Sequence, residues 1–141
     1  MKTLCLSSLL ILFIFLQGKA QYNSGISIVP VLKTDTTSIG QKIKYPSFPD
    51  PEVTMLKITI PPGKATGWHE HQFPVFAYVL KGVLTVELAG NKILEFGENT
   101  SFSEVLNTPH QGINKGQDDL VLLAIYMGEK GKPLSEKKDK P

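Results

Sequence analysis

Short apolar segments separated by turn residues run through most of the chain, and this feature constrains its fold more than any other. The segments VTMLKITI at 53–60, FAYVL at 76–80 and LVLLAIYM at 120–127 are rich in β-branched and aromatic residues. No segment after residue 20 keeps the apolar period of an amphipathic helix. With about seven to nine such strands, turning roughly every ten residues, the sequence predicts an all-β sandwich or barrel.

Several of the expected strands are apolar on both faces. VFAYVL at 75–80 and LVLLAIYM at 120–127 lack the alternation of a strand with one solvated face. The outer face of the barrel therefore needs a cover, which an N-terminal arm or a second copy of the chain would supply. We expect a homodimer.

The first 20 residues have the layout of a secretory signal peptide. MKTLCLSSLLILFIFLQGKA begins with a positive charge, continues with an apolar stretch and ends on small residues. The apolar stretch is short for a membrane span, which needs about 20 apolar residues. An uncleaved N-terminal anchor is the alternative. We expect cleavage after Ala20, export to the periplasm or the medium, and no membrane association of the mature chain.

The charge balance of the mature chain excludes some partners. Loss of Lys2 and Lys19 with the signal would leave 13 basic and 13 acidic residues, and the chain has no arginine. Such a neutral chain has no strong field for nucleic acid or an anionic membrane. Cys5, the only cysteine, lies in the signal, so no disulfide or thiol chemistry is expected in the mature protein.

Four regions follow from composition. Residues 1–20 form the signal, 21–40 an N-terminal arm with one or two short strands, and 41–128 a single β-barrel domain. Residues 129–141 are Lys-rich and poor in apolar residues, which predicts a flexible tail.

The three histidines of the chain have the pattern of a metal site. His69 and His71 are two residues apart, so in a strand both side chains lie on one face. His110 follows much later, after Pro109, at the start of another expected strand. Two imidazoles on one face can share a divalent metal, and a site that His110 joins would suit Fe, Mn, Ni, Cu or Zn.

Two motifs resemble those of the cupins. PPGKATGWHEHQFPVFAYVLKG resembles the first cupin motif, with Gly63, His69, His71 and Gly82 in matching positions. GENTSFSEVLNTPHQGIN resembles the second, in which a glycine precedes a histidine and an asparagine; Gly97, His110 and Asn114 match. The resemblance implies a small double-stranded β-helix, or jelly-roll β-barrel, like that of the small single-domain cupins of bacteria.

The first motif departs from the family at one position. Where cupins carry an acidic metal ligand, this chain has Val75, which cannot bind a metal. Three hypotheses remain open at this point. The histidines hold the metal alone, Glu104 reaches the site from a neighbouring strand, or the barrel binds a polar ligand without metal. Glu104 could equally be an outward-facing surface acid.

The resemblance leaves the function open, because one fold hosts many chemistries. A metal-dependent dioxygenase acting on a small organic substrate is one hypothesis. The alternatives are a non-catalytic cupin that binds a small ligand, and a structural barrel that serves dimerisation. No catalytic residue is assigned from the sequence.

Overall fold

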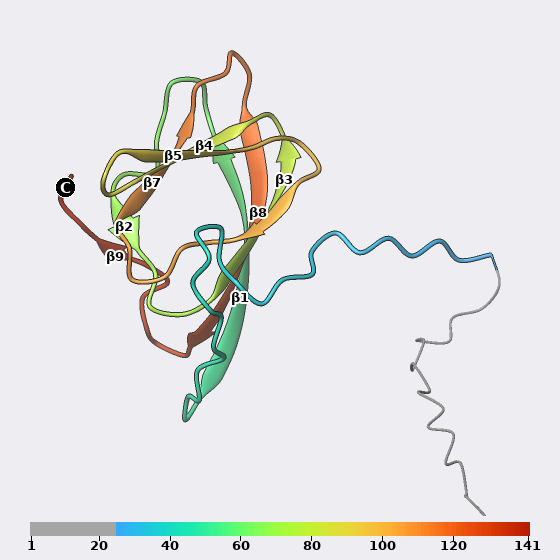
Figure 1. The fold of residues 1–141 in the computed structure, drawn as a ribbon, viewed down its shortest axis with the longest axis vertical. Coiled ribbons are helices and arrows are strands. Elements are labelled where there is room, and N and C mark those ends of the chain that lie inside the picture. The colour runs from blue at the N-terminus through green and yellow to red at the C-terminus, as the bar shows by residue number, and fades with distance from the viewer. Residues whose placement is uncertain (1–24) are drawn as a thin grey trace, which may run out of the picture.

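The computed structural model describes residues 25–141, which fold into two antiparallel sheets around a common core (Figure 1). The expected signal peptide lies outside the described residues. Every named element of the described part is a strand, and all paired strands are antiparallel. The expected all-β jelly-roll barrel is therefore confirmed.

One sheet has four strands and the other has five. The order in the first is β1-β8-β3-β6, with bounds β1 Pro51–Ile60, β8 Leu120–Glu129, β3 Val75–Lys81 and β6 Ser101–Ser103. The order in the second is β5-β4-β7-β2-β9, with bounds β5 Lys92–Phe96, β4 Leu84–Leu88, β7 His110–Asn114, β2 His69–Glu70 and β9 Glu136–Lys137.

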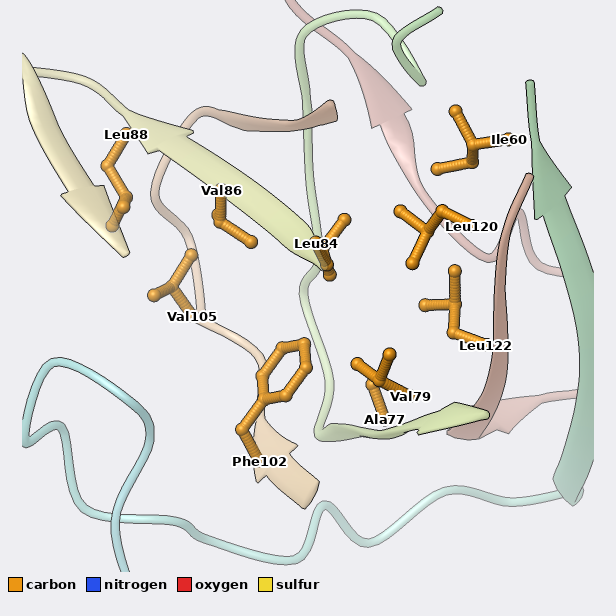
Figure 2. Packing of buried hydrophobic residues seen from close by; sticks show 10 residues of the cluster. All are labelled: Ile60, Ala77, Val79, Leu84, Val86, Leu88, Phe102, Val105, Leu120 and Leu122. Carbon is orange, nitrogen blue, oxygen red and sulfur yellow. The ribbon is translucent and has the colours of Figure 1, made fainter. Parts of the chain in front are cut away.

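The core lies between the two sheets. Along β8 the side chains alternate between buried and half-buried, because successive residues of a strand point to opposite faces. The inward residues of both sheets meet in one apolar cluster, shown in Figure 2: Ile60, Ala77, Val79, Leu84, Val86, Leu88, Phe102, Val105, Leu120 and Leu122. This burial supplies most of the driving force for folding.

Tight turns join the strands where glycine supplies the backbone freedom. Gly82, between β3 and β4, has a φ of 85° and lies against the backbone of Leu120. A side chain there would be strained by the positive φ.

The two ends of the described chain differ from expectation. Residues 26–29 form no strand, and their apolar side chains are exposed on an extended segment that leads away from the barrel (Figure 1). The Lys-rich tail was expected to be flexible, but its residues Glu136–Lys137 form β9 and pair with β2. Hydrogen bonds and ion pairs hold this strand in place of apolar burial, which is why its composition did not indicate it.

Asn114 anchors the end of β7. Its buried amide donates to the carbonyls of Ile60 and Asp118, at 2.7 Å each, and accepts from the backbone N–H of Gly116 at 2.9 Å. The side chain therefore connects the end of β1 to the turn between β7 and β8.

Replacing Asn114 by alanine is expected to lower the free energy of unfolding by about 2–4 kcal/mol, because buried carbonyls lose their donors. Urea denaturation followed by circular dichroism measures it. The control is Lys115→Ala, which removes an exposed ion pair with Glu87 and is expected to cost about 0.5 kcal/mol or less. Equal stability of the two variants would contradict the role given to Asn114.

Candidate metal centre

Two neighbouring strands bring the three histidines together. His69 in β2 lies directly opposite His110 in β7, and His71 follows β2 by one residue. The ring centroids are 4.5 Å apart for His69 and His110, 5.0 Å for His69 and His71, and 5.2 Å for His71 and His110. One ligand nitrogen from each lies within 4.8 Å of the others. The three histidines could therefore hold one metal ion, as the spacing predicted.

Backbone carbonyls orient all three rings. The Nδ1 atoms lie 2.8 Å from the Gly67 oxygen for His69, 3.0 Å from the Leu134 oxygen for His71, and 2.8 Å from the Thr108 oxygen for His110. A carbonyl only accepts, so each Nδ1 carries the proton and donates. The neutral tautomer then leaves the lone pair on Nε2, the arrangement that a metal-binding histidine needs.

The Nε2 atom of His110 differs from the other two in its burial and hydrogen bonding. It is buried, makes no well-formed hydrogen bond within residues 25–141, and has Oε2 of Glu104 nearby at 3.4 Å. A buried polar atom with so long a contact is poorly satisfied, so a ligand bound there would stabilise the site. A divalent transition metal fits this donor set.

Burial also keeps two of the rings in the neutral form. It lowers the pKa of His71 to about 4, and it lowers the pKa of His69 below its ordinary value. Burial acts on His110 in the same sense, but the nearby carboxylate of Glu104 outweighs it and raises the pKa of His110. At neutral pH, His69 and His71 therefore offer unprotonated Nε2 atoms.

Glu104 points into the site and is not a surface acid. Its side chain is 13% exposed, and its Oε2 atom lies 3.4 Å from Nε2 of His110. Burial alone would raise the pKa of this carboxyl, but His110, followed by His71 and His69, lowers it below its ordinary value. The carboxylate form thus faces the three imidazoles.

Glu104 lies beside Val75, the position at which the family motif carries its acid. Val75 is buried, 1% exposed, and its carbonyl accepts the backbone N–H of Glu104 at 2.9 Å. Glu104 follows β6, which pairs with β3. The acid therefore enters the site from the segment beside the position where the family motif would place it.

Tyr126 is a site residue that the sequence reasoning missed. Its ring lies 5.7 Å from that of His71, and burial raises the pKa of its phenol to about 12. The hydroxyl therefore remains a neutral donor across the physiological range. Strand alternation could have found it, because Tyr126 shares the inward face of β8 with Leu120 and Leu122.

The centre lies between a narrow inner cavity and an open outer pocket. The inner cavity, about 50 Å³, is lined by the three histidines, Glu104, Tyr126 and apolar core residues. The outer pocket, about 440 Å³, is lined by Thr66, Gly67, Trp68, His69, His71, Tyr126, Ser135 and Lys137. A small molecule in the outer pocket would therefore meet His69 and His71 at its inner end.

Comparison with known families identifies the fold. Residues 56–126, just over half of the chain, match the family described as Cupin domain. The chain belongs to the cupin family. The match includes both histidine motifs, so the resemblance seen in the sequence is confirmed. No curated protein matches the chain.

Several solved structures share this cupin fold. A cupin-like protein from Thermotoga maritima is 18% identical, with a TM-score of 0.54 over 62% of this chain and 65% of that one. A structure of the DMSP lyases RdDddP and RnDddQII is 20% identical, with a TM-score of 0.52 over 62% of this chain and 44% of that one. DMSP lyase DddQ from Ruegeria pomeroyi is 15% identical, with a TM-score of 0.50 over 57% of this chain and 41% of that one.

These likenesses show the fold alone, since folds host many functions. The chain spans less than half the length of either lyase chain.

Among residues 25–141, no helix is long and apolar enough to cross a membrane.

The tail contributes to the cupin site, and truncation tests this. A chain ending at Gly131 loses the Leu134 carbonyl that orients His71, and we expect its zinc affinity to fall about 10- to 100-fold. A chain ending at Lys138 keeps that carbonyl and should bind zinc like the full chain. Competition with a chelating dye measures both. Equal zinc affinity of the two truncated proteins, with folding verified by circular dichroism, would refute the role of the tail.

Proposed function

We propose that this cupin binds one divalent transition metal through His69, His71 and His110 and acts on a small organic substrate. The observation that carries the proposal is the convergence of the three histidines, whose ligand atoms lie within 4.8 Å of one another, with the carboxylate of Glu104 3.4 Å from Nε2 of His110. When bound, Fe, Mn, Ni, Cu or Zn supplies Lewis-acid chemistry, and the redox-active metals among them also support dioxygen chemistry.

Glu104 completes the proposed ligand set. Its carboxylate already faces Nε2 of His110 at 3.4 Å, and a hard oxygen donor beside three imidazoles suits all five metals. The position left by Val75 is then filled from the neighbouring segment. Tyr126, a neutral phenol at the boundary of the two pockets, is placed to donate a hydrogen bond to a substrate oxygen.

The proposed activity is that of a metal-dependent dioxygenase for a small enol or diketone-like compound. Support comes from the open outer pocket, which is lined by two of the histidines, and from the apolar side chains that line part of the inner cavity. Oxygen uptake by the iron-loaded protein with such a compound tests it. Ligand binding without turnover would instead make the protein a non-catalytic binding cupin.

Metal content tests the ligand set. Each of the variants His69→Ala, His71→Ala and His110→Ala should lose most of its bound metal, because each removes a coordinating nitrogen. Glu104→Gln should weaken binding about as much as loss of one histidine. The matched control is Glu95→Gln, an exposed acid on β5. Elemental analysis of the purified proteins measures the occupancy.

Two outcomes contradict this assignment in different ways. Full metal content in every single histidine variant would refute the metal centre itself. Full content in Glu104→Gln alone would show that three histidines suffice and would leave Glu104 as a proton acceptor beside them.

We also propose a homodimer. β1 is an edge strand of its sheet, and the outward side chains of Val53 and Met55 are each 60% exposed. The extended arm carries further exposed apolar residues, including Ile26 and Ile28. An arm from a second copy could add to the β1 edge and cover this surface. Sedimentation at micromolar concentration should show a dimer that Met55→Glu weakens, and a wild-type monomer would contradict it.

Export is part of the same proposal. It is supported by the charged start, apolar stretch and small-residue end of residues 1–20. Mass spectrometry of the protein from its native host should find an N-terminus near Gln21. An intact Met1 on the mature protein would contradict export by cleavage.

A further inference from the structure

A positive charge from the C-terminal tail lies in line with the metal centre. β2 is paired on both sides: His69 faces His110 of β7 on one side and Lys137 of β9 on the other. Directly opposed residues of antiparallel strands project from the same face. His110, His69 and Lys137 therefore form a row across the sheet, with the lysine at the outer end.

Lys137 and its neighbour Lys138 have opposite surroundings. Lys138 points to the other face and forms ion pairs with Glu70 at 2.8 Å and with Glu136 at 3.2 Å. Lys137 forms no ion pair with any residue in the range 25–141, and its side chain lines the outer pocket. Acidic side chains therefore pair with Lys138 on the outer face, whereas within residues 25–141 none pairs with Lys137 on the pocket face.

The rest of the outer pocket carries no charged side chain, because burial lowers the pKa of both of its histidines, His69 and His71. No aspartate or glutamate lines it. Its walls combine the half-buried indole of Trp68, the hydroxyls of Thr66 and Ser135, and the phenol of Tyr126. At about 440 Å³ it has the size of a small-molecule site. It therefore offers one cation, a few donors and a flat apolar surface.

We propose that Lys137 binds the carboxylate of a small organic anion in this pocket, so that the tail selects anionic substrates for the metal centre. The inference rests on the proposed function, because the metal centre supplies the chemistry. A single ammonium with neighbouring hydroxyls balances one negative charge. A phosphate monoester carries close to two charges and calls for more cationic groups than this pocket contains.

Trp68 gives a direct readout of binding. It is the only tryptophan of the chain, so its fluorescence reports the pocket without background from other indoles. Benzoate serves as the anionic probe and benzamide as its neutral counterpart of similar shape. Both are titrated into the full-length mature protein loaded with zinc, and the zinc content of each sample is measured in parallel.

Four proteins are compared: the wild type, Lys137→Met, Lys137→Arg and Lys130→Met. Met keeps an apolar stem of similar length but removes the charge, whereas Arg keeps the charge. Lys130 is an exposed tail lysine that does not line the pocket, so its variant is the matched control. We expect benzoate affinity to fall about tenfold or more in Lys137→Met. Lys137→Arg should retain most of it, Lys130→Met should behave like the wild type, and benzamide should bind weakly to all four.

Two results overturn the inference: benzoate binding that is equal in Lys137→Met and the wild type, or no benzoate binding to the zinc-loaded wild type. The measured zinc content distinguishes failure of the anion-binding proposal from failure of the proposed metal centre. A wild type that retains zinc but shows no dependence on Lys137 refutes anion selection alone. A wild type that fails to bind zinc refutes the proposed function as well.

Discussion

The pairing of the two-residue strand β2 between β7 and β9 is the constraint on which the rest of the site depends. β2 is too short to fix its own position, so its register is set by the strands on either side. That register places His69 between His110 and Lys137. A slip of one residue would turn His69 outward and bring Glu70, which now pairs with Lys138, to the inner face.

Orientation of the imidazoles adds a second constraint. Each Nδ1–H is held by a carbonyl whose direction is set by local backbone structure, as at Gly67, where φ is 82°. The carbonyl for His71 comes from the tail, 63 residues away in sequence. The site is therefore organised before any ligand arrives, and its organisation is coupled to the docking of the tail.

The sequence predicted what depends on local pattern. Strands such as β1 and β8 follow from β-branched runs, and the histidine cluster follows from the two-residue spacing and the second motif. It did not predict β9 or the role of Tyr126. β9 is held by ladder hydrogen bonds and by the ion pairs of Lys138, which leave no apolar signature. The inward position of Tyr126 matters only once its neighbours across the barrel are known.

This chain has Val75 where the family motif has an acid, and this difference affects the surroundings of Tyr126 as well as those of the histidines. Val75 lies opposite Tyr126 in the β3–β8 ladder, and both belong to a buried apolar cluster with Phe73 and Ala124. A carboxylate at position 75 would stand beside the phenol and compete for its hydrogen. Burial, together with the negative charge of the nearby Glu104, raises the pKa of Tyr126 to about 12.

The acidic side chain near the histidines, that of Glu104, lies on the segment after β6 and not on β3, and its Oε2 atom is 3.4 Å from Nε2 of His110. Glu104 balances the charge at the proposed metal centre, while Tyr126 keeps its proton free for a molecule in the outer pocket. Lys137 stands at the outer end of the row that it forms with His69 and His110, so the proposed anion site lies in the outer pocket and the proposed metal site lies beside the inner cavity.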